Sequence, residues 1–291
     1  MKILGVGIAT LDIINRVERY PDEDSEVRVI SQRRCRGGNA TNTLSVLAQL
    51  GHACAWAGVL PQDDPDAAFV EEALCARQID LRHLHRLSSG SVPTSYITLS
   101  DASGSRSITH FRDLAEYRAQ WFVDGVEADE FDWIHFEGRA PDELEVMLRH
   151  LSGVEGVRVS VEIEKPRTGI EALFQLAEVL LFSRHYAQAT GHDDAPSLLR
   201  SVARQLNEQR PLLFCAWGDS GAWALDRQGE LLHAPAVNLP AVVDTVAAGD
   251  VFNAAVIAAL GEGSAPMEAL VRGCELAALK CTMEGLEEIF R

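Results

Sequence analysis

The hydrophobic and polar positions change pattern several times along the chain, and each pattern predicts a type of element. Residues 2–9 form a short, apolar, glycine-containing run, typical of a strand buried on both faces of a parallel sheet. After residue 38, strand-like segments alternate with helix-like ones, which indicates an α/β fold: a mostly parallel central sheet flanked by helices. We predict strands at 53–59, 133–136, 158–162 and 212–217, a hairpin over 222–232, and helices at 39–50, 66–78, 249–260 and 266–280.

Four other segments alternate between apolar and polar residues, as strands with one solvated face do. They are residues 12–20, 26–33, 94–99 and 105–111. We interpret them as one small sheet built from two excursions, at 12–36 and 90–113, from a single α/β domain that spans residues 1–291. A cleft between this β lid and the body is where we expect the chemistry.

Composition narrows the class of protein. The 291 residues include 26 Lys and Arg against 43 Asp and Glu, a formal net charge of −17, which disfavours nucleic-acid or anionic-membrane partners. The six cysteines form no Cys-x-x-Cys pair, so we expect buried thiols in a reducing compartment. Met1 and Lys2 lead directly into the first strand, and no apolar run is long enough to cross a bilayer, so we expect a cytoplasmic protein.

Gly5-x-Gly7-x-x-Thr10 is similar to the start of a dinucleotide fingerprint, but threonine stands where the third glycine is needed. The segment after it has a strand pattern, so no helix N-terminus is available for a pyrophosphate. We therefore predict that the two glycines serve tight packing of the first strand. No Gly-Lys pair exists in the sequence, which excludes a P-loop.

The segment Asp244–Leu260 has a run of small residues that leads into an alanine-rich helix. Unhindered N–H groups at a helix N-terminus make an anion site by geometry and by the helix dipole. Asp250 in this segment is open to two interpretations on local pattern alone. It is either a helix-capping aspartate or a general base beside a hole for a transferring phosphoryl group.

Two motifs carry a family resemblance. Asp244–Asp250 followed by Val-Phe-Asn resembles the C-terminal signature of the ribokinase-like carbohydrate kinases, and Arg36-Gly-Gly-Asn-Ala-Thr-Asn42 resembles their N-terminal one. Other segments resemble, in order, those of the ketohexose kinases of this family: residues 20–26, 90–93, 102–106, 133–139, 159–167 and 215–217. The resemblance implies transfer of a phosphoryl group from ATP, with Mg²⁺, to a ketohexose, typically to the C1 hydroxyl of fructose.

The resemblance also implies residue roles. Asp250 matches the catalytic base, and Ala247, Ala248 and Gly249 match the anion hole, although the first of these three is usually glycine. If the backbone there needs a positive φ, alanine costs about 1 kcal/mol or more. We expect that only the N–H group matters and that nothing is lost.

Sugar recognition is expected at Asp12, Gly38, Asn39 and Asn42, together with Asp250. Asn39 and Asn42 are three residues apart at the start of a helix, so they share one face, and their amides both donate to and accept from hydroxyls. Taken singly, an asparagine cap and a turn aspartate explain these residues equally well. Jointly, they favour a binding site that discriminates among hydroxyls.

Further positions match the nucleotide site of the family. Arg106 matches an arginine on the lid that reaches the phosphates. Gly218, Asp219, Ser220 and Gly221 match the ATP loop, with Ala247 and Gly249 at the phosphates, and Ala277, Lys280 and Cys281 match the adenine side. A purely structural helix face explains Ala277 and Cys281 almost as well.

The metal site is the part that the sequence defines least. Ser183-Arg-His-Tyr186 stands where many relatives carry an Asn-x-x-Glu segment linked to magnesium. We expect Mg²⁺ to be held chiefly by ATP phosphates, with Glu162 or Glu164 reaching it through water. Residues 185–194 contain His192, Asp193 and Asp194 without a recurring ligand spacing, so we predict a solvated loop there.

Three questions remain open at the level of sequence. The acceptor is a ketohexose or, in a related kinase, ribose, a nucleoside, a sugar acid or C6 of fructose. The alternative from a different functional class is a non-catalytic sugar sensor built on the same fold. The retained Asp250 argues against this alternative, and Ala247, in place of the usual glycine, argues weakly for it. The resemblance also implies a homodimer that pairs through the β lid.

Overall fold

The computed structural model describes residues 1–207, 211–287 and 289, and its centre is a nine-stranded sheet. The strand order is β13-β12-β11-β10-β9-β8-β1-β4-β5, with β12 and β13 antiparallel at one edge and parallel pairing elsewhere. The strands are β1 (Lys2–Val6), β4 (Ala53–Pro61), β5 (Asp80–Leu87), β8 (Trp133–Glu137), β9 (Arg158–Ile163), β10 (Val179–Ser183), β11 (Leu212–Ala216), β12 (Ala222–Leu225) and β13 (Leu231–Ala234).

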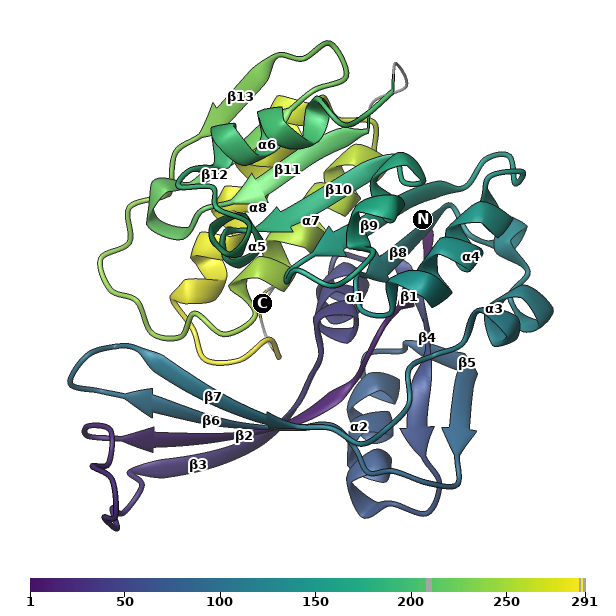
Figure 1. The fold of residues 1–291 in the computed structure, drawn as a ribbon. Helices are drawn as coiled ribbons and strands as arrows, with labels where there is room; N and C mark the ends of the chain where they lie inside the picture. The colour runs from purple at the N-terminus through teal and green to yellow at the C-terminus, as the bar shows by residue number, and fades with distance from the viewer. Residues whose placement is uncertain (208–210, 288, 290–291) are drawn as a thin grey trace.

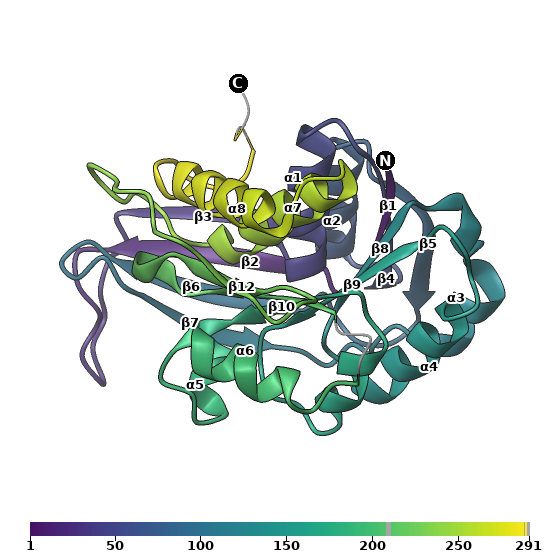
Figure 2. The same ribbon diagram turned by 90° about the horizontal axis from the view of Figure 1, so that it is seen from above.

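Helices cover both faces of this sheet, and each face has its own hydrophobic cluster. Figure 2 shows α1 (Asn39–Gln49), α2 (Pro65–Cys75), α7 (Ala248–Gly261) and α8 (Pro266–Cys281) on one side. On the other side lie α3 (Ala119–Gly125), α4 (Pro141–Leu151), α5 (Arg184–Ala189) and α6 (Ala195–Ala203). Short 3₁₀ turns occupy η1 (Ala128–Glu130), η2 (Ile170–Gln175) and η3 (Gly218–Ser220). The predicted fold class, a mostly parallel sheet flanked by helices, is confirmed.

A second sheet of four strands extends from the body, as Figure 1 shows. It contains β2 (Thr10–Val17), β3 (Ser31–Gly37), β6 (Thr94–Ser100) and β7 (Arg106–Phe111) in the order β3-β2-β6-β7. The register aligns Asp12 with Ser95 and Ser95 with His110. Because side chains alternate along a strand, Arg106, four residues before His110, lies on the same face of the lid as Asp12.

Gly5 and Gly7 set the distance between β1 and α1. A Cβ at Gly5 would lie 2.6 Å from Leu44 Cδ1, and one at Gly7 would lie 2.6 Å from Ala40 Cβ. Both contacts are closer than packed carbon atoms allow. The prediction that these glycines serve tight packing of the first strand is confirmed.

Some predicted elements are wrong. The strand predicted at 26–33 is shifted, because β3 begins at Ser31; Val27 and Val29 are exposed in an irregular connection that no neighbouring strand pairs. The loop predicted at 185–194 is wrong over its first half, since α5 runs to Ala189; residues 190–193 do form a connection, which ends at Asp194, the N-cap of α6. Pattern analysis missed β5, β10 and the helices α3–α6. A short strand such as β10, apolar up to its last residue, shows no alternation that would reveal it.

Two smaller expectations concern the cysteines and membranes. All six cysteines are free, but Cys75 is exposed, which corrects the prediction that all six are buried. Burial raises the pKa of Cys54 and of Cys215 to about 12. Among the residues with described structure, no helix combines the length and the apolar character that a membrane crossing requires.

Candidate active site

The candidate site lies where parallel strands end and the N-termini of two helices meet. Helices α1 and α7 pack against each other, and their first turns face the carboxyl ends of β1, β8 and β9. In open α/β sheets this edge is where ligands bind, because the loops that leave the strands diverge there. The fold therefore brings the N-terminal and C-terminal sequence motifs to one place.

Asp250, in the first turn of α7, is the central acidic group of this site, and it is only 7% exposed. The amide nitrogen Nδ2 of Asn42 donates a hydrogen bond of 2.7 Å to Asp250 Oδ2. The buried Arg36 guanidinium donates to Asn42 Oδ1 at 2.9 Å, which orients the amide with its NH₂ group toward Asp250. The relay Arg36–Asn42–Asp250 thus holds the carboxylate in a defined position.

Other carboxylates surround Asp250 and change its acidity. Burial raises the pKa of Asp250 well above its ordinary value, and the charges of Glu164 and Glu137 add to this, while the Asn42 hydrogen bond opposes it. Burial, with the charges of Asp250 and Glu137, likewise raises the pKa of Glu162. A carboxylate whose pKa is raised toward neutrality is a better proton acceptor for a hydroxyl than an ordinary aspartate.

Glu162 is only partly satisfied. Its Oε1 accepts a hydrogen bond of 3.0 Å from Nδ2 of Asn253, one turn beyond Asp250 on α7. Its buried Oε2 has no hydrogen-bond partner within the described part of the chain, although the neighbouring Asn39 amide lowers its pKa. Asn39 and Asn42 therefore face two different carboxylates of one cluster. Sequence analysis predicted their common face but not Asn253.

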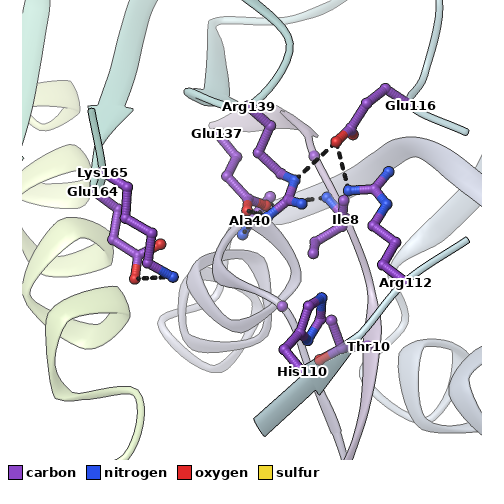
Figure 3. A network of polar contacts seen from close by, with 12 residues as sticks. Ile8, Thr10, Ala40, His110, Arg112, Glu116, Glu137, Arg139, Glu164 and Lys165 are labelled. Atoms are coloured by element: carbon purple, nitrogen blue, oxygen red, sulfur yellow. Dashed lines mark hydrogen bonds and ion pairs between the residues drawn. The ribbon is translucent and has the colours of Figure 1, made fainter. Parts of the chain in front are cut away.

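Glu137 anchors the start of α1 to the sheet. Its Oε2 accepts from the backbone N–H of Ile8 at 3.1 Å and of Ala40 at 3.4 Å. Arg139 lies 3.5 Å from Glu137 Oε1, and Glu116 links Arg139 to Arg112, as Figure 3 shows. A cavity of about 20 Å³ beside Glu137 and Arg139 has the size of one water molecule. This network was missed, since no motif joins residues so far apart in the sequence.

The loop before α7 corrects one expectation. Ala247, the N-cap of α7, has φ 64° and ψ 11°, in the left-handed region. The expectation that alanine loses nothing here is wrong, because the Cβ of an L-residue is strained in this region by about 1 kcal/mol or more. A Cβ added at Gly249 would meet no atom within 4 Å, so the first turn of α7 borders open space on that side.

The lid places two predicted residues toward the site. Asp12 is buried, accepts from Thr10 Oγ1 at 2.8 Å, and has a pKa that burial raises. A Cβ on Gly37 would lie 2.1 Å from Asp12 Oδ2, so only glycine leaves room for this carboxylate. Arg106 reaches across from β7, where its Nη1 donates to Thr245 Oγ1 at 2.8 Å. The lid therefore contacts the loop that leads into α7.

Gly38 is the N-cap of α1, with φ 103°, and a Cβ there would lie 2.3 Å from the Ile8 carbonyl oxygen. Glycine is the residue that accommodates both the positive φ and this close approach of two backbones. The first turn of α1, with Asn39, consequently begins directly against the end of β1.

The predicted nucleotide residues lie on two elements. Gly218–Ser220 form η3 after β11, with Asp219 exposed and Gly221 closing the turn by an N–H bond to the Gly218 carbonyl. Ala277 and Cys281 lie on α8, and the Cys281 carbonyl accepts from Val243 N–H at 2.8 Å. Lys280, expected beside them on the adenine side, is instead fully buried, with its ammonium on Asp244 and Met283.

The stretch expected to differ from a magnesium motif has a structural role. Ser183 Oγ donates to the Glu164 carbonyl at 2.6 Å and accepts from Tyr186 N–H, which caps α5. No group of three or more His, Cys, Asp or Glu side chains is arranged to hold a metal ion among the described residues.

Comparison with known proteins agrees with this geometry. The sequence matches the description "pfkB family carbohydrate kinase" over residues 1–289. The chain belongs to the pfkB family. Ketohexokinase of Mus musculus is 40% identical over 296 residues, which cover 99% of this chain and 98% of the mouse protein. The pfkB kinase described here is therefore a ketohexokinase-like phosphotransferase that acts on a sugar hydroxyl.

Solved structures show the same fold. A putative ribokinase from Agrobacterium tumefaciens superposes with a TM-score of 0.84 at 22% identity, covering 98% of this chain and 92% of that chain. The ribokinase of Arabidopsis thaliana, solved with ribose and ATP, has a TM-score of 0.79 at 18% identity, covering 99% and 95%. The ribokinase-like architecture predicted from the sequence is thus confirmed for this pfkB kinase.

The strain at Ala247 predicts a stabilising substitution. Ala247→Gly should raise the free energy of unfolding by up to about 1 kcal/mol, because glycine has no Cβ to strain at positive φ. Ala248→Gly, in the next, helical residue, is the matched control and should lower it by about 0.5–1 kcal/mol. Urea unfolding followed by circular dichroism measures both. Equal effects of the two substitutions would contradict the conformational argument.

The raised pKa of Glu162 predicts a pH-dependent gain from Glu162→Gln. The folded state binds the proton more tightly than the unfolded state, whose pKa is near the ordinary 4.5, so ionisation destabilises the fold as the pH rises above that value. The variant should melt above the wild type at pH 7.5, by about 2–4 °C for each kcal/mol. The gain should vanish toward pH 4.5. Glu155→Gln, on the surface, should show no gain, and a pH-independent difference would refute the assignment.

Proposed function

We propose that this kinase transfers the γ-phosphoryl group of ATP to the C1 hydroxyl of fructose, with Asp250 as general base. The observation that carries the proposal is the buried Asn42–Asp250 hydrogen bond of 2.7 Å, which joins the sugar motif on α1 to the carboxylate at the start of α7. The relative that is 40% identical bears the name ketohexokinase, which supports a ketohexose as acceptor. The ribokinase of Arabidopsis thaliana, solved with ribose and ATP, supports ATP as donor in this fold.

In this proposal Asp250 accepts the proton of the attacking hydroxyl as the new O–P bond forms and the bond to the leaving ADP breaks. Its raised pKa suits that step, since a more basic carboxylate accepts the hydroxyl proton more readily. The backbone N–H groups of Ala247, Ala248 and Gly249, at the positive end of α7, stabilise the charge on the transferring phosphoryl group. The hydrogen bond from Asn42 holds the Asp250 carboxylate in one orientation.

The sugar in this proposal lies between the lid and α1. Asp12, on the lid face that also carries Arg106, accepts from sugar hydroxyls, and Asn39 and Asn42 both donate and accept beside Gly38. Asp12 is already constrained by Thr10 Oγ1 at 2.8 Å, and Asn42 is constrained by its hydrogen bonds with Arg36 and Asp250. A sugar that lacks the matching hydroxyl would leave such a group unpaired, which is the basis of discrimination.

The nucleotide in this proposal extends from the α7 N-terminus to the turn at Gly218–Gly221 and to the α8 face at Ala277 and Cys281. Arg106, held on Thr245, supplies positive charge at the phosphates from the lid. Closure of the lid over bound sugar would exclude water, so that the sugar hydroxyl is favoured over hydrolysis.

The residues present fit a hydrated Mg²⁺ held mainly by nucleotide phosphates. Such an ion needs one or two carboxylates, and the buried Glu162 Oε2, without a partner within the described residues, is one that is available. Glu164 is the second candidate, through water. When bound, Mg²⁺ would neutralise charge on the nucleotide phosphates.

The Asp250→Asn substitution tests the proposal. We expect kcat with fructose and ATP to fall by about 10² to 10⁴ while sugar affinity, measured by calorimetry, is retained, because Asn preserves shape but not basicity. Asp193→Asn, an exposed turn residue, is the control and should act as wild type. An active Asp250→Asn enzyme contradicts the role of Asp250.

The acceptor is tested with an ADP-release assay across fructose, tagatose, ribose, a sugar acid and adenosine, with phosphorus NMR to locate the phosphate. Fructose 1-phosphate as the preferred product supports the assignment. Faster turnover of another acceptor, or transfer to C6, assigns the enzyme to a related kinase. Binding of sugar without turnover by the wild type would indicate a sensor.

We also propose that the protein works in the cytoplasm, because free cysteines are compatible with a reducing compartment.

We also propose that two copies pair through the β lid. Tyr96 and Phe111 lie on the lid face opposite to that of Asp12 and Arg106, and they are 48% and 56% exposed, which is unusual for large apolar side chains. Phe111→Lys should convert a dimer at micromolar concentration into a monomer, as measured by light scattering after gel filtration. Val146→Lys, on α4 far from the lid in Figure 1, should leave the dimer intact. A wild type that is monomeric at that concentration refutes the pairing.

A further inference from the structure

Lys280 is one of three lysines in the chain, and its side chain is 0% exposed, a rare state for this residue type. It lies in the last turn of α8. A buried ammonium is unfavourable unless each of its three N–H donors finds an acceptor. The proposed reaction assigns no role to the Lys280 ammonium.

Within the described residues, the acceptors of Lys280 Nζ come from two residues, Asp244 and Met283. The ammonium lies 3.1 Å from Asp244 Oδ2, donates to the Asp244 carbonyl oxygen at 2.8 Å, and donates to the Met283 carbonyl oxygen at 3.4 Å. One carboxylate oxygen and two carbonyl oxygens therefore surround one positive charge. This donor set is that of a small enclosed cation site, occupied here by a side chain.

Asp244 connects this charge to the loop before α7. Its Oδ1 accepts from Val246 N–H at 2.8 Å, and its Oδ2 accepts from Gly285 N–H at 3.1 Å. Although burial by itself raises the pKa of Asp244, these amides and Lys280 hold it below its ordinary value, so Asp244 is ionised at neutral pH. The next residue after Val246 is the strained Ala247, where the amides of the candidate anion hole begin.

The same loop is held from two more sides. The Cys281 carbonyl, at the end of α8, accepts from the N–H of Val243 at 2.8 Å, and Arg33 of the lid lies 3.6 Å from Asp244 Oδ2. Neither contact replaces Lys280, because Arg33 reaches the Asp244 carboxylate and Cys281 accepts from backbone N–H groups, whereas Nζ contacts the Asp244 carboxylate and carbonyl together. Without Nζ, a buried anion and two carbonyl dipoles would face one another, and the backbone at 244–247 would have to move to relieve this.

We propose that the ammonium of Lys280 is an internal counter-cation that positions the anion-hole loop, residues 244–249, for phosphoryl transfer. Lys280 is a positioning residue, since its contacts are with Asp244 and Met283 and none is with the reacting groups. It acts on the orientation of the Ala247–Gly249 amides through Asp244 and Val246. The inference rests on the proposed role of those amides.

Chemical rescue of Lys280→Ala tests this inference. The substitution removes three methylenes and the ammonium, the equivalent of a propylammonium ion. We expect kcat to fall by about 10- to 100-fold, since small displacements of positioned groups have effects of that order, with KM for sugar and for ATP within about twofold. Propylammonium chloride should restore kcat in a saturable manner, and sodium chloride at equal ionic strength should not.

Lys2→Ala is the matched control, because Lys2 is exposed at the start of β1 and its removal should give neither loss nor rescue. Lys280→Met is the second variant; it fills the space with apolar atoms and, where Lys280→Ala does not fold, carries the test alone. It should lose kcat without response to propylammonium. A folded Lys280→Met or Lys280→Ala enzyme with wild-type kcat overturns the proposal, and so does a loss expressed mainly in KM.

A thermal melt separates this inference from the proposed function. Because an ion that binds only the folded state stabilises it, propylammonium should raise the melting temperature of Lys280→Ala but not of the wild type or Lys2→Ala. This readout needs no turnover. An inactive wild type would refute the proposed function alone, whereas absence of the selective melting shift in folded Lys280→Ala would refute the cation role of Lys280 alone.

Discussion

The hydrogen bond between Asn42 and Asp250 joins the two halves of this molecule. It connects residues 208 positions apart, at the first turns of α1 and α7. A buried carboxylate is tolerated only where hydrogen bonds or charges compensate for lost water. Asn42 supplies that compensation directly, and Arg36 supplies it at one remove. The packing of α1 on α7, with the close approach permitted by Gly5 and Gly7, is therefore also what makes the acidic site possible.

The acidic cluster behind this bond is unfavourable for stability and suited to chemistry. Glu137 and Glu162 are buried near Asp250, and burial raises the pKa of each. Such like-charge clusters concentrate at functional sites, where a shifted pKa is useful. Positive charges nearby compensate for part of this negative charge. Arg36 contacts Asn42, Arg139 contacts Glu137, and Lys280 contacts Asp244 in the loop before α7.

Strain and charge meet at the same loop. Ala247 is held in a left-handed conformation that glycine adopts more easily, and Asp244, three residues earlier, is held by backbone amides and a buried ammonium. A strained backbone persists only where its surroundings over-determine it. The contacts of Asp244 with α8, the C-terminal segment and the lid satisfy that condition.

Local patterns were sufficient for much of the fold. The spacing of apolar residues and the residue preferences for helix or strand identified the helices that carry Asn42 and Asp250 and the hairpin β12–β13. These elements can be recognised within one short segment of sequence. The strand β10, apolar up to its last residue, was missed. The strand containing Cys35 was placed too early, because the connection at Val27 and Val29 alternates like a strand but has no partner strand. Pairing is a property of two segments, which one segment cannot reveal.

The sequence by itself determined the α/β class, the kinase family and the two motifs, because these reside in residue order and spacing. Only the tertiary structure decided that Asn42 meets Asp250, that Glu162 and Asn253 join them, that Ala247 carries a positive φ and that Lys280 points inward onto Asp244. Each of these depends on contacts between elements distant in the chain. Burial and mutual charge, which set the acidity of the site, exist only once those elements are packed.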